Sequence, residues 1–190
     1  MKRIIIINIL LTILFSKNIQ SYTIDTENSQ LRWEASKVTG SHWGYIKMKK
    51  GEIILNGEKV VSGEFFVDLN TITVEDMGAS PWAEKLVNHL KSDDFFYVEN
   101  FPLASLVLIS ADFKKGSFVI TGDLTIKGKT HPISFPAVIN FSEFGPSASG
   151  QLKIDRTNYN IIYRSGKFYP DIGDKLIYDE FIIDFILKTK

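Results

Sequence analysis

Hydrophobic and polar residues alternate over most of this chain, as expected for β-strands that bury one face. Leu31, Trp33 and Ala35, for example, alternate with Arg32 and Glu34. Short turn-forming segments separate these stretches, which favours an antiparallel meander that closes on itself. About eight strands are predicted, and their ranges are 31–36, 45–55, 59–69, 103–112, 117–127, 130–144, 147–155 and 177–187.

One hairpin has a particularly clear signal. Leu124 and Ile126 are expected on one face of its first strand, with Thr125 and Lys127 on the other. Gly128 can adopt a positive φ, so we predict a two-residue type II′ turn that opens at this glycine. Nothing in this hairpin indicates catalysis. Taken by itself, the hairpin indicates only a structural role.

One segment departs from the strand pattern. Ser80 is a good helix N-cap, and the proline that follows it suits the first helical position. Trp82, Leu86 and Leu90 then recur at helical spacing. We therefore predict an amphipathic helix over residues 81–91. It could plug a barrel end or wall by simple packing, or it could be a lid over a cavity mouth.

Residues 155–175 form a long stretch that is rich in aromatic and turn-forming residues. Long segments of this kind in small domains often serve function, and this one is predicted to fold over another part of the molecule. Its basic residues Arg156, Arg164 and Lys175 could bind anionic oxygens. They could equally pair with aspartates of the same segment.

The N-terminus has the pattern of a secretory signal peptide. Lys2 and Arg3 precede an apolar run over residues 4–15, and the small residue Ser21 offers a cleavage position. The run is short for a membrane span, although an uncleaved N-terminal anchor remains the alternative. We predict a signal peptide over residues 1–21 and a periplasmic or secreted bacterial protein.

The remaining residues, 22–190, show no linker and no repeat, and are predicted to form one domain. The signal region holds three basic residues and no acidic one, which leaves 19 basic and 22 acidic side chains and a net charge of about −3. No excess of positive charge favours nucleic-acid binding. The chain has no cysteine, which excludes disulfides, thiol nucleophiles and a lipid-modified N-terminal cysteine.

Motifs for catalysis or metal binding are not found in the sequence. His42, His89 and His131 lie far apart, and none is part of a zinc-binding motif. A G-x-S-x-G motif and phosphate-binding glycine loops are also missing. We predict no metal, no cofactor and no enzymatic activity. Lys37 and His42 lie in a polar stretch, 36–44, which could bind a ligand head group or could simply connect two strands.

Two predicted strands contain stretches, 103–109 and 181–187, that are apolar on both faces. Eight strands close into a barrel whose interior is filled by side chains or holds one small ligand. Their extra apolar residues could pack under the helix or the long segment, or they could line an open tunnel.

Several short segments, each weak by itself, follow one another along the whole of residues 22–190. They are Trp33 with residues 36–44, Gly63-Glu64-Phe65 with Val67-Asp68, residues 89–96, Phe101-Pro102 with Ala104, residues 122–136, Asp155-Arg156-Thr157 with Tyr159, Ser165-Gly166 with Phe168, and Gly173-Asp174-Lys175. In this order they resemble the YceI-like family of polyisoprenoid-binding, lipocalin-like bacterial proteins. The resemblance implies an all-β fold: an extended, eight-stranded, antiparallel, lipocalin-like β-barrel with one helix near an end.

The resemblance further implies an apolar tunnel that holds a long-chain isoprenoid or a related amphiphile, polyprenyl or quinone-like. Alternation along each strand selects the residues expected to line it, and a register error of one residue would invert the selection. These tunnel-wall residues are Trp33, Phe65, Val67, Phe118, Ile120, Leu124, Ile126, Leu152 and Phe185. Residues proposed to contact the head group are Lys37, His42, Arg156 and Lys175.

Taken together, these patterns predict a lipid-binding protein that carries, stores or sequesters its ligand. The expected partners are the long-chain lipid, no nucleic acid, and transiently a membrane or membrane protein, with the protein itself a monomer or homodimer. One alternative is an enzyme that acts on a bound lipid or quinone. Another is a filled barrel that serves as a partner of a membrane redox protein.

Overall fold

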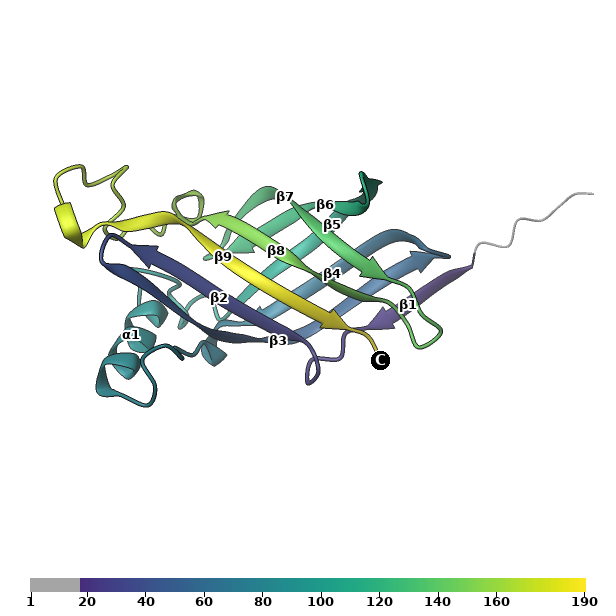
Figure 1. Ribbon diagram of the computed structural model, residues 1–190, viewed down its shortest axis with the longest axis horizontal. Coiled ribbons are helices and arrows are strands. Elements are labelled where there is room, and N and C mark those ends of the chain that lie inside the picture. Colours follow the sequence, from purple (N-terminus) through teal and green to yellow (C-terminus); the bar gives the residue numbers. More distant parts are fainter. Residues whose placement is uncertain (1–17) are drawn as a thin grey trace, which may run out of the picture.

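The computed structural model describes residues 18–190, which form nine strands, one α-helix and three 3-10 helices (Figure 1). Residues 1–17 of the predicted signal peptide lie outside the described residues. No helix in the described range is long and apolar enough to cross a membrane. The elements are β1 (Ile19–Thr23), β2 (Gln30–Lys37), β3 (Gly40–Asn56), β4 (Lys59–Asp68), η1 (Leu69–Thr71), α1 (Pro81–Lys91), β5 (Leu103–Lys114), β6 (Ser117–Ile126), β7 (Lys129–Asn140), β8 (Ser147–Asp155), η2 (Arg156–Tyr159), η3 (Gly173–Lys175) and β9 (Ile177–Lys188).

Eight of the strands close into an antiparallel barrel. Its order is β3-β2-β9-β8-β7-β6-β5-β4, and pairing between β3 and β4 completes the ring. This confirms the predicted fold class. A ninth strand, β1, pairs with the C-terminal half of β3 (Figure 1). It was not predicted, because its first residues were assigned to the end of the signal peptide.

β3 is longer than predicted and begins at Gly40. The stretch 36–44 is therefore not a polar connection: β2 and β3 pair up to Lys37 and Gly40, and only two residues form the turn between them. His42 is consequently a strand residue, placed opposite Ala35 of β2. Turn-forming residues misled the prediction, because here they lie in the strands next to the turn.

The hairpin at Gly128 has the predicted strands but a different turn. Ile126 pairs with Lys129, so Lys127 and Gly128 are the two central residues. Both have positive φ, 50° and 70°, which is the pattern of a type I′ turn rather than the predicted type II′. Leu124 and Ile126 are buried as predicted.

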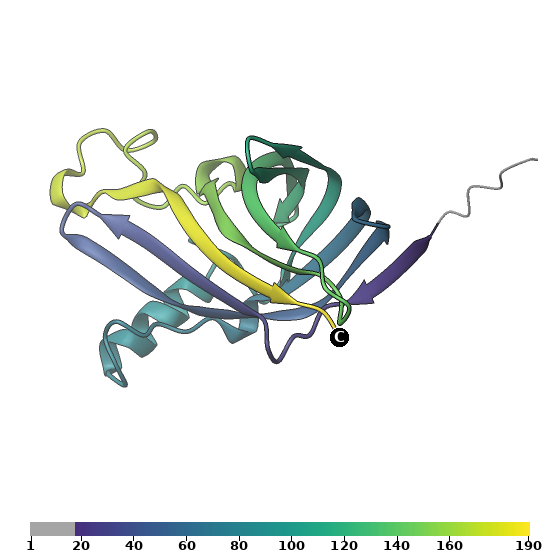
Figure 2. The ribbon, with the colours of Figure 1, turned by 45° about the vertical axis from the view of Figure 1, so that its right-hand side comes forward.

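α1 has the predicted bounds and lies at one end of the barrel (Figure 2), which we call the α1 end. The Ser80 hydroxyl accepts a hydrogen bond from the Ala83 N–H at 3.2 Å and caps the helix. Leu90 is buried, whereas Trp82 is 70% exposed and lies beneath a lysine ammonium group. Placing Trp82 on the packed face was therefore wrong.

The ring of strands has two places where neighbouring strands stop pairing. The first interruption lies at the α1 end, between β7 and β8. These strands pair only from Ala137↔Gly150 to Asn140↔Ser147. The rest of β7, residues 129–136, has no partner in β8, and we call this interruption the β7–β8 gap.

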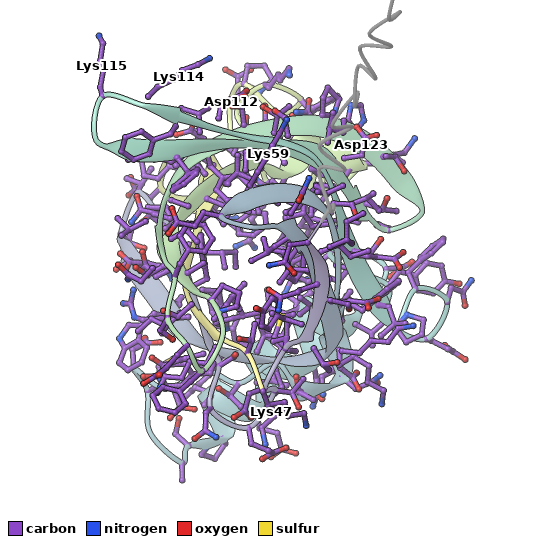
Figure 3. All side chains as sticks on the ribbon, turned by 90° about the vertical axis from the view of Figure 1, so that its right-hand side faces the viewer. Lys47, Lys59, Asp112, Lys114, Lys115 and Asp123 are labelled. Atoms are coloured by element: carbon purple, nitrogen blue, oxygen red, sulfur yellow. The ribbon has the colours of Figure 1, made fainter. Side chains whose placement is uncertain are left out.

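At the opposite end of the barrel, β4 and β5 stop pairing at Gly63↔Leu108. β4 nevertheless reaches back to Lys59, and β5 continues to Lys114. The two arms diverge beyond their last pair (Figures 2 and 3), and we call this interruption the β4–β5 gap.

Candidate ligand-binding site

A cavity of about 210 Å³ runs through the interior of the barrel. It reaches from Leu90 and Phe95 near α1 to Val60 and Leu187 in the other half of the barrel. The exposed surface of its wall is entirely apolar. An apolar cavity of roughly 150 Å³ in another protein stays dry and binds benzene, so a space of this size and character suits hydrocarbon better than water.

Eight of the nine predicted tunnel-wall residues line this cavity, because they lie on the inward face of their strands. These eight are Trp33, Phe65, Val67, Ile120, Leu124, Ile126, Leu152 and Phe185. The structure therefore brings together side chains from five strands, as the alternation indicated. That they contact a ligand stays a prediction.

Phe118 is the ninth predicted wall residue, and it does not line the cavity. It has the inward direction expected for β6, but it lies one layer beyond Ile120, toward the end opposite α1. There its ring packs edge-on against Phe113 at 5.1 Å and against Phe141 at 6.2 Å between ring centroids. Alternation predicts the direction of a side chain, not how far along the barrel the cavity extends.

At the α1 end, the cavity is covered by the helix and by the segment that follows β8. Leu90 of α1 and Ile161 of that segment both line the wall, and Ile161 is only 1% exposed. His89 packs edge-on against Phe95 and Tyr163, which joins the helix to the segment. The predicted folding of residues 155–175 over another part of the molecule is confirmed.

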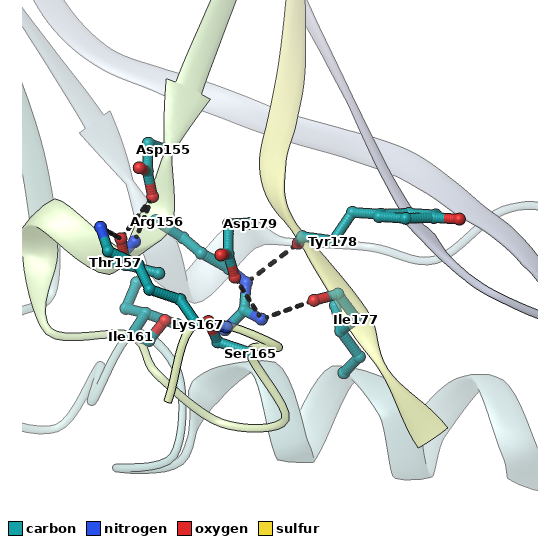
Figure 4. A network of polar contacts seen from close by, with 9 residues as sticks. All are labelled: Asp155, Arg156, Thr157, Ile161, Ser165, Lys167, Ile177, Tyr178 and Asp179. Carbon is teal, nitrogen blue, oxygen red and sulfur yellow. Dashed lines mark hydrogen bonds and ion pairs between the residues drawn. The ribbon is translucent and has the colours of Figure 1, made fainter. Parts of the chain in front are cut away.

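Arg156 holds this covering segment in place (Figure 4). Its Nε donates to the Tyr178 carbonyl at 3.1 Å, Nη1 to the Ile161 carbonyl at 2.7 Å and Nη2 to the Ile177 carbonyl at 2.9 Å. Nη2 also lies 3.3 Å from the Asp179 carboxylate. Burial lowers the pKa of Arg156, and the charge of Asp179 opposes this effect.

These contacts change the interpretation of Arg156. A guanidinium has five N–H donors, of which three donate to backbone carbonyls here, and its charge is paired with Asp179. The alternative interpretation expected an ion pair with an aspartate of the same segment. The partner is instead Asp179 of β9. Arg156 lines the cavity and is 4% exposed, yet its polar atoms are committed to the protein.

The other predicted head-group residues do not line the cavity. His42 lies on β3, where its Nδ1 is 2.8 Å from the Asp76 carboxylate, a hydrogen bond that holds the segment after η1. Burial alone would raise the pKa of Asp76, but hydrogen bonds from the Trp43 N–H and His42 hold it below its usual value. Lys37 and Lys175 lie toward the α1 end, near Ile177 of the cavity wall.

Several wall residues were missed by the sequence analysis. Leu106 and Leu108 of β5 line the cavity, and the apolar stretch 103–109 was the signal that could have identified them. Ile161 and Phe95 lie outside strands, where no alternation selects them. Within residues 18–190, no three histidine or acidic side chains are grouped as metal ligands.

Comparison with known proteins identifies the family. A model of the YceI-like domain matches residues 22–189. The chain belongs to the YceI-like family. A UPF0312 protein of Shewanella denitrificans is 35% identical over 127 residues, which cover 63% of this chain and 62% of that protein. A UPF0312 protein of Staphylococcus aureus is 29% identical over 153 residues, or 74% of this chain and 82% of that protein.

Solved structures share the fold of this YceI-like chain. BcnA of Burkholderia cenocepacia superposes with a TM-score of 0.70 at 20% identity, covering 86% of this chain and 98% of BcnA. A polyisoprenoid-binding domain from Saccharophagus degradans, implicated in plant cell wall breakdown, gives a TM-score of 0.62 at 13% identity, covering 87% and 95%. At these identities the likeness concerns the fold alone.

Proposed function

We propose that this YceI-like protein binds a long-chain isoprenoid or a related amphiphile, polyprenyl or quinone-like, inside its barrel. The observation that carries the proposal is the cavity, whose exposed wall is apolar from α1 to the layer of Leu187. Each methylene buried there would contribute about 0.8 kcal/mol. The Saccharophagus neighbour, described as polyisoprenoid-binding, supports this choice of ligand class.

Binding without catalysis fits the chemistry of the wall. Among residues 18–190, the only ionisable side chains of the wall are those of Arg156 and Tyr178, and Arg156 already has protein partners. General acid–base catalysis requires a group within hydrogen-bond reach of the reacting atom. We therefore propose carriage, storage or sequestration of the ligand in a periplasmic or secreted protein, as the N-terminal pattern suggests.

The size of the cavity adds a condition to the proposal. Its volume of about 210 Å³ lies below the roughly 300–1,000 Å³ typical of sites for drug-sized ligands. A long chain then requires lining side chains to change rotamer. Leu106, Leu108 and Ile139 are suited to this because they line the wall and are only partly buried.

The decisive experiment is to purify the protein from its native host, extract it with organic solvent and identify the extract by mass spectrometry. The proposal expects one class of long-chain isoprenoid lipid in stoichiometric amount. Protein that repeatedly yields no lipid, and that takes up none from added vesicles, would refute it.

Leu124→Asp tests whether the wall holds the ligand. A carboxylate in the apolar cavity should abolish lipid retention, whereas Thr125→Asp on the outward face of the same strand should retain it. Since Leu124→Asp could also unfold the barrel, Ala137→Leu provides a second variant that fills the cavity with hydrocarbon. Full lipid content in a folded Ala137→Leu variant would place the ligand elsewhere.

A further inference from the structure

The β4–β5 gap has a definite structural cause. Ile54 pairs with Ser62 and Leu55 with Val60, so Val61 is an extra residue in β4. On β5, Leu108 pairs with Gly122 and Ser110 with Thr121, so Ile109 is an extra residue there. Both bulge residues lie within two positions of the last β4–β5 pair, Gly63↔Leu108. Bulges bend a strand and end its pairing, and two of them turn the arms apart.

The cavity reaches this gap from inside. Val60 of the β4 arm and Leu108 at the base of the β5 arm both line the cavity wall. They stand on opposite sides of the place where pairing stops. The gap is therefore an interruption of the barrel wall next to the cavity, and not an interruption over solid core.

The outer margin of the gap is unusually apolar for an exposed surface. Val61 is 49% exposed, Ile109 58% and Phe113 66%. These three side chains come from the two arms that border the gap. They give it an apolar margin that continues the apolar wall of the cavity.

Aromatic rings continue this apolar surface along the β5–β6 hairpin. The bulge at Ile109 shifts the alternation of β5, so that Phe113 pairs with Phe118 and shares its face. Phe118 in turn packs against Phe141, two residues beyond Ile139 of the cavity wall. Phe113, Phe118 and Phe141 thus form an aromatic strip from the hairpin tip to the last layer of the cavity.

Charged side chains surround this margin. Lys114 and Lys115 form the tip of the β5–β6 hairpin, and Lys59 begins the β4 arm (Figure 3). Asp112 lies among them, where the Ser110 hydroxyl donates to it. Exposed aliphatic and aromatic residues flanked by lysines are typical of protein surfaces that lie in the headgroup region of a bilayer. Lysine stems can cover apolar surface while the ammonium groups reach water or phosphate.

We propose that the β4–β5 gap is the portal through which a hydrocarbon chain passes between the cavity and a lipid surface. This rests on the proposed function, because it assumes that the cavity holds lipid. Val61, Ile109 and Phe113 enter the headgroup region, and the aromatic strip guides the chain inward. The lysines of the two arms contact lipid phosphates, and Asp112 keeps this attraction modest.

Closing the gap tests the portal. The chain has no cysteine of its own, so Val61→Cys/Ile109→Cys can be joined by a short bismaleimide without side reactions. The matched control is Glu64→Cys/Val107→Cys, an outward-facing pair in the intact ladder of the same two strands. Uptake of a fluorescent long-chain prenol from phosphatidylcholine vesicles is measured before and after cross-linking. Since the hydrocarbon chain must cross the gap, uptake should slow about tenfold or more in the protein cross-linked across the gap. It should stay unchanged in the cross-linked control.

The contact with lipid is tested separately by vesicle flotation. Ile109→Ser/Phe113→Ser should bind vesicles about tenfold more weakly, because binding scales with buried apolar area. Trp82→Ser, an equally exposed aromatic at the α1 end, should bind like the unchanged protein.

The outcomes separate the portal from the proposed function. Normal uptake after cross-linking across the gap would overturn the portal while leaving lipid binding intact. Equal loss with Trp82→Ser, or a dimer that forms through the gap and disappears on cross-linking, would overturn it as well. A protein that takes up no lipid in any form, and yields none on extraction, overturns both.

Discussion

The two interruptions of the barrel ladder differ in what the chain does next. At the β7–β8 gap, β8 runs directly into the segment of residues 156–176, which folds back over the opening. Tyr159, only 3% exposed, packs edge-on against His131 of β7. At the β4–β5 gap, the β4 arm starts and the β5 arm ends in two-residue turns. Within residues 18–190, neither of these turns is long enough to fold over the opening.

This difference shows how a barrel can close one end and leave an opening at the other without changing its strand order. An unpaired stretch becomes closed wall when a long connection follows it, and remains an opening when a tight turn follows it. The covered gap is also held by directional contacts of Arg156 (Figure 4). At the opposite end, the ring of Phe118 on β6 packs edge-on against Phe141, the residue that follows β7.

Arg156→Met should have the largest effect on this comparison. It would leave three carbonyl groups without their donor and Asp179 without its ion-pair partner, at a cost of about 3 kcal/mol in the free energy of unfolding. Urea unfolding measures this. Arg164→Met, an exposed arginine of the same segment that lies over Tyr163, should cost less than about 1 kcal/mol. Equal losses in both variants would mean that the covering segment is not held by Arg156.

Phe118→Ala should have an intermediate effect. Phe118 is partly buried between Phe113 and Phe141, so its removal should lower the free energy of unfolding by about 1–2 kcal/mol. Because the strip would be interrupted next to the cavity, bound lipid should also be released faster. Phe144→Ala, at the 84% exposed Phe144 of the β7–β8 connection, should stay within about 0.5 kcal/mol. Unchanged release from Phe118→Ala would show that the strip does not border the ligand's path.

The smallest effect is expected for Tyr159→Phe, and only at alkaline pH. Burial, with a smaller contribution from Asp155, raises the pKa of Tyr159 to about 12 from its ordinary 10.0. The folded protein therefore favours the protonated phenol. Its stabilising contribution is complete below pH 10.0 and is lost as the pH rises from there to about 12.

Unfolding measured across this alkaline range checks the effect. Tyr159→Phe should lose less stability than the unchanged protein, and the difference should vanish at neutral pH. Tyr169→Phe is the control, since Tyr169 is in the same segment but 45% exposed. If Tyr159→Phe and the unchanged protein lose stability equally, the segment that covers the β7–β8 gap does not depend on a neutral Tyr159.

How far the sequence could lead is clear from particular residues. Leu124 and Ile126 could be placed inside because a strand has only two faces and one must be buried. Pro132 and Pro136 could also have indicated the β7–β8 gap, since proline cannot donate to a ladder and both lie in the part of β7 that has no partner in β8.

Other features depended on contacts between distant parts of the chain. Nothing local marks Val61 and Ile109 as bulge residues, because a bulge is defined by the register of the partner strand. Two of the three carbonyl acceptors of Arg156, those of Ile177 and Tyr178, lie on β9, more than twenty positions away. Only the closed barrel brings them together.

The bulges at Val61 and Ile109 have a further consequence for how such a barrel can vary. Each arm owes its divergence to a single additional residue. Deleting both residues would restore regular alternation on β4 and β5 and allow their ladder to extend past Gly63↔Leu108. Only two single-residue deletions would therefore separate a barrel with a gap in its wall from a fully closed barrel. Access to the interior can therefore be gained or lost while every residue of the lining stays the same.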